Sequence, residues 1–231
     1  MDKKTWIIVG VLIVAFLGLV GISIAQNTIP QNDISMVYEP SDANGNFGEM
    51  IEGDPNAPVK IYEYGDYQCD ACAPMNPYVN EIVEEYDGKV AVVYRTMIMS
   101  YHQCGTSAAS AALAASRQGY WKEYKDYLYE NQDDWFYSDP TECPTQFQDY
   151  FKKVADGKGD MEKFVADMGS SEVSQKISFD AGLAKKQKVS FTPTFYVEGD
   201  FVDQRNKTRD AFLEELKAKI DEKLAEKGVE K

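Results

Sequence analysis

The chain has few basic residues, one histidine and four cysteines, and these low counts limit the classes of protein to which it can belong. It carries 24 Lys and Arg against 38 Asp and Glu, for a formal net charge of −14. A surface of that sign repels nucleic acid and anionic membrane surfaces, so we expect no nucleic acid partner. An ordinary self-repelling soluble surface explains the acidity. The chain contains no internal repeat, which argues against repeat architectures.

Charged residues are also absent from residues 6–25, directly after Asp2, Lys3 and Lys4. About 20 residues of helix span the bilayer core, and the two lysines favour a cytoplasmic N-terminus. We therefore predict a transmembrane anchor over residues 1–26, a single-pass cell-membrane protein, and an extracytoplasmic remainder. A cleaved signal peptide is the alternative, because residues 23–25 resemble a small-x-small cleavage site. Residues 27–54 show no period and predict a linker.

The most informative stretch is a strand-like run that ends in two cysteines. Residues 59–64 are rich in β-forming residues and lie between Pro58 and Gly65. Cys69 and Cys72 follow, and the prolines just after them suit the first turn of a helix. A thiolate at a helix N-terminus is stabilised and leaves readily in thiol–disulfide exchange. A structural disulfide or half of a zinc site would give the same spacing.

A second stretch, residues 190–197, is β-rich but contains Pro193 after Thr192. Proline cannot donate to a β-ladder, so it belongs at a strand start, where a cis peptide bond would be a specific feature. Together with the C-x-x-C stretch, this resembles the thioredoxin superfamily, and within it the DsbA-like thiol oxidoreductases. Residues 102–132 resemble the inserted helical region of that family. The resemblance covers about residues 55–225.

The predicted fold class is α/β: a thioredoxin fold with an inserted α-helical subdomain, preceded by the N-terminal transmembrane helix. The expected order of elements is β-α-β, a helical block, then α-β-β-α. The first part of the thioredoxin domain is predicted over residues 55–102, the helical insertion over 103–169 and the second part over 170–231.

The resemblance implies roles for five residues. Cys69 would be the exposed nucleophile, and Cys72 the buried resolving thiol. Glu63 would accept the proton of the buried thiol; alternatively its carboxylate points to solvent or pairs with Arg95. Thr192 and Pro193 would cover the disulfide and present backbone groups to a bound peptide.

Between the cysteines stand Asp70 and Ala71, where oxidising family members more often carry Pro-His or a similar pair. A carboxylate beside a thiolate should raise the pKa of that thiol. A less stabilised reduced form would make a weaker oxidant.

Cys104 and Cys143 remain, and an even cysteine count outside the cell favours pairing. We expect a structural disulfide, which would stabilise the fold by about 4 kcal/mol in the chain-entropy model. A second redox pair is one alternative. Zinc held by Cys69, Cys72, His102 and Cys104 is another. His102 is otherwise expected to be a loop residue without a special task.

The sequence therefore predicts an extracytoplasmic thiol–disulfide oxidoreductase without a cofactor, most simply a dithiol oxidase. Its implied partners are thiol-containing exported polypeptides and a membrane quinone-linked thiol oxidase. A disulfide reductase or isomerase would use the same residues in the other direction. A zinc-stabilised tethered binding module without catalysis is the alternative from another class.

Overall fold

The computed structural model describes residues 35–230 of the chain. The predicted membrane helix, and the signal peptide that was its alternative, lie outside these residues. Between residues 35 and 230, every helix is too short or too polar to cross a bilayer.

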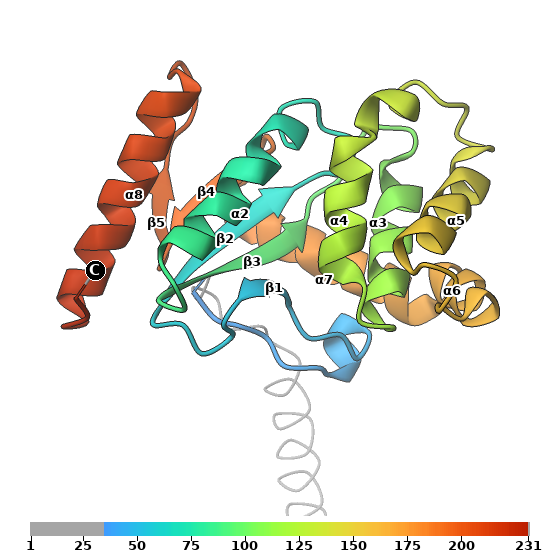
Figure 1. The fold of residues 1–231 in the computed structure, drawn as a ribbon, viewed down its shortest axis with the longest axis horizontal. Helices are drawn as coiled ribbons and strands as arrows, with labels where there is room; N and C mark the ends of the chain where they lie inside the picture. The colour runs from blue at the N-terminus through green and yellow to red at the C-terminus, as the bar shows by residue number, and fades with distance from the viewer. Residues whose placement is uncertain (1–34, 231) are drawn as a thin grey trace, which may run out of the picture. The chain divides into compact units, whose positions relative to one another are not determined.

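A five-stranded mixed sheet forms the centre of this domain, in the order β1-β3-β2-β4-β5 (Figure 1). The strands are β1 (Met50–Gly53), β2 (Val59–Gly65), β3 (Val90–Thr96), β4 (Thr194–Val197) and β5 (Asp200–Val202). β2 and β3 are parallel and are joined through a helix, whereas the other neighbouring pairs are antiparallel. The predicted thioredoxin order of strands and helices is confirmed.

Helices cover both faces of the sheet. The α-helices are α2 (Asn76–Glu85), α3 (Gly105–Ser116), α4 (Trp121–Glu130), α5 (Cys143–Val154), α6 (Met161–Met168), α7 (Ser171–Lys186) and α8 (Arg209–Glu226). Three short 3-10 helices are η1 (Asp42–Asn44), η2 (Ala73–Met75) and η3 (Gln132–Asp134). The apolar side chains of α2 and α8 pack on one face, while α7 crosses the other (Figure 1). Burial on both faces explains why apolar and aromatic residues occupy consecutive positions in β3, and in β2 apart from Lys60 and Glu63.

The helical segment predicted over residues 103–169 is present as α3 to α6. The alanine-rich helix α3 lies at its centre and contacts α4, α5 and α6. Alanine side chains are short, so neighbouring helices can approach closely around α3. The core of this block also includes Cys69 and Cys72, so the insertion packs directly against the C-x-x-C segment.

The linker predicted over residues 27–54 is wrong for residues 35–54. Residues 50–53 form β1, which pairs with β3, so the folded domain begins before residue 55. Glu49 is buried, and its carboxylate lies 2.9 Å from both Arg95 and Lys176. A four-residue strand has too few positions to show a period, and this one is stabilised by pairing with a distant part of the chain.

Candidate active site

The C-x-x-C segment lies directly after the carboxyl end of the central strand β2. Gly65 ends that strand beside the Tyr94 ring; a Cβ atom on Gly65 would lie 2.6 Å from the ring. The backbone then turns, with the Cys69 N–H donating to the Asp66 carbonyl at 3.0 Å and the Cys72 N–H donating to the Cys69 carbonyl at 3.0 Å. The sequence predicts Cys69 at or just before a helix N-terminus. In the structure the first helical turn, η2, begins at Ala73 and α2 follows at Asn76, so a short turn separates Cys69 from the helix.

Two thiols lie in this turn with different surroundings. Cys69 is 5% exposed and its Sγ atom lies 3.3 Å from the carbonyl oxygen of Thr192. The peptide bond between Thr192 and Pro193 is cis, as the sequence predicted. Cys72 is completely buried. Cys69 is therefore not the exposed thiol that the sequence predicted, because both cysteines are buried, but it is the less buried of the two. The expectation that Cys72 is buried is confirmed.

The two thiols also differ in acidity. A hydrogen bond from the Cys72 thiol, with smaller help from the backbone at Ala71 and Cys72, lowers the pKa of Cys69 to about 6 against its burial. Burial raises the pKa of Cys72 well above its ordinary value, and the hydrogen bond it gives to Cys69 raises that pKa further. Cys69 is thus a thiolate at neutral pH, whereas Cys72 keeps its proton.

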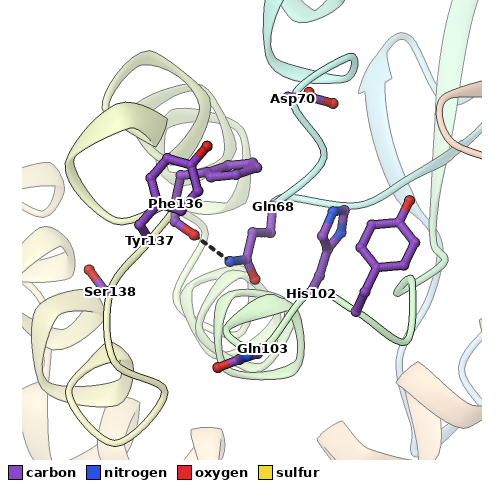
Figure 2. Close-up of a pocket in the computed structure, with 8 residues that line it drawn as sticks. Gln68, Asp70, His102, Gln103, Phe136, Tyr137 and Ser138 are labelled. Carbon is purple, nitrogen blue, oxygen red and sulfur yellow. Dashed lines mark hydrogen bonds between the residues drawn. The ribbon is translucent and has the colours of Figure 1, made fainter.

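Asp70 and Ala71 are both exposed, and Figure 2 shows the Asp70 carboxylate set apart from the side chains below it. The sequence predicted that Asp70 would raise the pKa of Cys69. The pKa of Cys69 nevertheless lies below its ordinary value, because the hydrogen bond from Cys72 dominates, and the contribution of Asp70 stays a prediction.

Glu63 is buried beneath the two cysteines, in the middle of the sheet. In the register of the sheet it lies between Tyr94 of β3 and Phe195 of β4. Burial raises the pKa of the Glu63 carboxyl to about 7, a change that nearby Lys125 opposes and the charge of Cys69 increases. A carboxyl with that pKa can take up or release a proton at neutral pH.

Neither alternative for Glu63 holds in this structure. The residue is 6% exposed, so its carboxylate does not point to solvent. Arg95 pairs with Glu49 at 2.9 Å, and alternation along the strands places Arg95 and Glu63 on opposite faces of the sheet.

Lys125, which the sequence analysis missed, comes from α4 of the helical insertion. Its ammonium lies 2.9 Å from Glu52 of β1 and 3.0 Å from Asp126. The lysine is 3% exposed and lies close enough to Glu63 to lower the pKa of that carboxyl. Trp121, Tyr124 and Tyr129 are aromatic residues at helical spacing and predict that α4 is a core helix, but nothing in that pattern indicates that its lysine is buried.

Two buried glutamines, also missed, hold the C-x-x-C turn in place. Gln132 of η3 donates to the carbonyl oxygens of Tyr67 and Cys69, at 2.8 and 3.0 Å. Gln68 donates to the carbonyl of Phe136 at 2.7 Å and accepts from the Cys104 N–H at 2.7 Å. Each glutamine joins the C-x-x-C segment to the helical insertion, across many residues of sequence, so only the tertiary structure identifies them.

His102 does have a defined contact, contrary to the sequence prediction. Its Nδ1 atom lies 2.7 Å from Oδ2 of Asp66, a carboxylate that is completely buried. The same carboxylate accepts from the backbone N–H groups of Gln68 and Met99, at 3.0 and 2.8 Å. Asp66 and His102 therefore tie the start of the C-x-x-C turn to the loop before α3.

A disulfide joins Cys104, at the start of α3, to Cys143, the first residue of α5. The zinc set of Cys69, Cys72, His102 and Cys104 is not assembled, because the Cys104 sulfur is bonded to Cys143. Within residues 35–230 no cluster of three or more His, Cys, Asp or Glu side chains has metal-binding geometry.

Two pockets flank the C-x-x-C turn. The first, of about 380 Å³, adjoins the Pro193 loop and is lined by residues including Ala71, Met75, Pro193, Lys207, Arg209 and Phe212. The second, of about 420 Å³, lies on the side of the helical insertion and is formed by residues 101–103 and 136–138 with Gln68 and Asp70. We call the second the aromatic pocket. In Figure 2, Gln68 lies between Phe136 and Tyr137 on one side and His102 on the other.

Comparison with known proteins identifies the fold and the chemistry shared by this site. The family model described as Thioredoxin matches residues 46–222. The chain is 30% identical over 160 residues to the probable disulfide bond formation protein D of Bacillus cereus, a match that covers 65% of this chain and 70% of that protein. It is 32% identical over 154 residues to Na(+)/H(+) antiporter NhaA 1 of Mycobacterium sp. strain KMS, with 65% of this chain covered. The match spans about a quarter of that antiporter, 24% of its length.

Solved structures give the same fold. Oxidised BdbD of Bacillus subtilis superposes with a TM-score of 0.64 at 22% identity, covering 82% of this chain and 98% of that one. Alpha-DsbA1 of Wolbachia pipientis gives a TM-score of 0.63 at 20% identity, covering 86% and 97%. A thioredoxin-like oxidoreductase of Silicibacter pomeroyi gives a TM-score of 0.61 at 26% identity, covering 78% and 95%.

Proposed function

The chain belongs to the thioredoxin superfamily, as a DsbA-like thiol–disulfide oxidoreductase, and we propose that it oxidises pairs of thiols in exported polypeptides. The observation that carries this proposal is the asymmetry of the two thiols. Cys69 lies beside the Thr192 carbonyl with a lowered pKa, and Cys72 is fully buried with a raised pKa.

The reaction begins with the Cys69–Cys72 disulfide and a client thiolate. The client sulfur attacks Cys69, the Cys69–Cys72 bond breaks, and Cys72 leaves as a thiolate. Because burial disfavours that charge, Cys72 takes a proton, and Glu63 is the buried acid placed to supply it. The second client thiolate then attacks the client sulfur of the mixed disulfide, and Cys69 leaves as a thiolate. The client has lost two electrons to the enzyme, which is now a dithiol.

The acidity of Cys69 favours this direction. At pH 7 a thiol with a pKa near 6, rather than the ordinary 9, stabilises the reduced enzyme by about tenfold. For a two-electron couple this makes the enzyme about 30 mV more oxidising. The lowered pKa of Cys69 therefore shifts the equilibrium towards oxidation of a client thiol pair.

The cellular setting of the proposal rests on the sequence. An uncharged run over residues 6–25, preceded by two lysines, supports a membrane anchor with the catalytic domain outside the cytoplasm. Disulfides form and persist in such compartments. The enzyme would then be reoxidised by a membrane quinone-linked thiol oxidase, as the family resemblance implies.

Trapping of mixed disulfides tests for thiol–disulfide exchange. Oxidation of a reduced client by the oxidised chain tests the direction of electron flow. Cys72→Ala should accumulate client proteins disulfide-bonded to Cys69, and Cys69→Ala should accumulate none. The oxidised wild-type chain mixed with a reduced, unfolded two-cysteine client should give one client disulfide for each enzyme reduced. Absence of any mixed disulfide would overturn the proposal. Reduction or reshuffling of the client, without net oxidation, would favour a reductase or isomerase.

A further inference from the structure

The aromatic pocket adjoins the C-x-x-C turn, and both chain neighbours of Cys69 line it. Asp70 and Gln68 both line the pocket (Figure 2). Asp70 directly follows Cys69 in the chain, and Gln68 directly precedes Cys69. A polypeptide that reacts with Cys69 therefore has residues within reach of this pocket. The inference below rests on the proposed function, because it concerns the side chains of the client.

The walls of the pocket are held in place rather than loose. One wall, residues 101–103, directly precedes Cys104, and the other, residues 136–138, lies five residues before Cys143, its disulfide partner. Gln68 bridges the same two walls through the Phe136 carbonyl and the Cys104 N–H. A pocket fixed in this way is available to a ligand before binding, which reduces the entropy lost on binding.

The rim of the pocket is aromatic and exposed. Tyr137 is 92% exposed and Tyr101 is 69% exposed, and both rings flank the opening with Phe136. Phe136 and Tyr137 have their ring centres 4.7 Å apart with nearly perpendicular planes, so the two rings present different faces to the pocket. Aromatic faces carry negative electrostatic potential and attract lysine and arginine side chains.

The charged lining of the pocket has one sign. Asp70 is the acidic residue among the side chains that line it, and none of them is a lysine or arginine. His102 also lines the pocket, and its Nδ1 lies 2.7 Å from the buried Asp66 carboxylate.

We propose that the aromatic pocket binds an arginine or lysine side chain of the client polypeptide, close to the cysteine that reacts with Cys69. The exposed rings stack on the cationic group and Asp70 supplies the opposite charge. An acidic client side chain would meet the Asp70 carboxylate and no lysine or arginine among the residues that line the pocket. Arginine should bind better than lysine, because its planar guanidinium stacks on aromatic rings and is more weakly hydrated.

Matched peptides provide the test. Each carries two cysteines and differs only at one residue near the reacting cysteine, which is arginine, its uncharged analogue citrulline, or glutamate. The varied residue is placed in turn at two positions on either side of that cysteine. With the oxidised full chain at low ionic strength, we expect kcat/KM for arginine to exceed that for citrulline by about tenfold at one or more positions. Glutamate should react more slowly than citrulline, and the preference should shrink with added salt.

Variants assign any preference to the pocket. Tyr137→Ser and Asp70→Asn should each reduce the ratio of arginine to citrulline rates, and the ratio cancels any change that Asp70→Asn makes in the redox potential. The control variants Phe201→Ser and Asp156→Asn remove an exposed ring and an exposed carboxylate outside the pocket, and should leave the ratio unchanged.

The outcomes separate this inference from the proposed function. If all three peptides are oxidised at rates within twofold of one another, or if the pocket variants keep the preference, the inference is wrong and the proposed function stands. If no peptide is oxidised, the proposed function fails and the inference fails with it.

Discussion

Replacing the buried Glu63 with glutamine should stabilise the folded state of the reduced protein at neutral pH. The Glu63 pKa rises from 4.5 to about 7 because the carboxyl is buried. The folded protein therefore holds this proton over a pH range in which the unfolded chain has lost it. Lys125, Glu52 and Cys69 also act on the carboxyl, but burial is the largest cause.

The sign and size of the effect follow from linkage. Below pH 4.5 the carboxyl is protonated in both states and contributes nothing to the pH dependence of stability. As the pH rises from 4.5 towards 7, the unfolded state ionises and the folded state does not, so folding loses stability. The loss reaches about 3 kcal/mol at pH 7 and changes little above it. Glutamine cannot ionise, so Glu63→Gln should recover this amount.

Urea unfolding of the reduced chain between pH 4 and pH 8, followed by circular dichroism, measures the difference between Glu63→Gln and wild type. Cys69 and Asp180 also titrate in this range, but they do so in both proteins and largely cancel in the difference. Glu81→Gln, an exposed glutamate on α2, serves as the control and should show no such trend. A stability difference that is flat with pH would refute a raised pKa for Glu63. The variant should also exchange disulfides more slowly, since Cys72 would lose its proton donor.

Three further predictions concern the neighbouring residues. The pH profile of the Cys69 alkylation rate should have its midpoint near pH 6. Cys72→Ala should move that midpoint upward, because the Cys72 thiol donates the hydrogen bond that lowers the Cys69 pKa most. An unchanged midpoint in Cys72→Ala would contradict this. The double variant Cys104→Ala, Cys143→Ala removes the Cys104–Cys143 disulfide. Its unfolding free energy should be lower by about 4 kcal/mol, since the disulfide closes a loop of sequence separation 39, and exchange through Cys69 should be intact. Loss of exchange in the still-folded double variant would favour a redox role for this disulfide. Gln68→Ala should reduce stability by about 1–3 kcal/mol, because it leaves the buried Phe136 carbonyl and Cys104 N–H without this partner. Thermal unfolding of the variant and the wild type tests it, and equal midpoints would show that the bridge adds no stability.

Much of the fold could be predicted from the sequence, because its evidence is local. The apolar run of β2, the C-x-x-C spacing and the Thr192-Pro193 dipeptide each lie within a few residues. Ser170 and Thr208 cap α7 and α8: their hydroxyls accept from the backbone N–H groups of Val173 and Ala211, which lie only three residues further along the chain. Such patterns depend on the period of a strand or the end of a helix, which neighbouring residues fix.

Tertiary structure alone decided what surrounds these elements. The strand β1 exists because β3 pairs with it, and Glu49 is buried because Arg95 and Lys176 meet it there. Lys125, like the two glutamines of the C-x-x-C turn, reaches its partners across many residues of sequence. The pKa of a thiol or carboxyl depends on burial and on charges within a few ångströms, whatever their distance in sequence. The sequence therefore determined which residues react, and the packing of the helical insertion against the sheet determined their acidity.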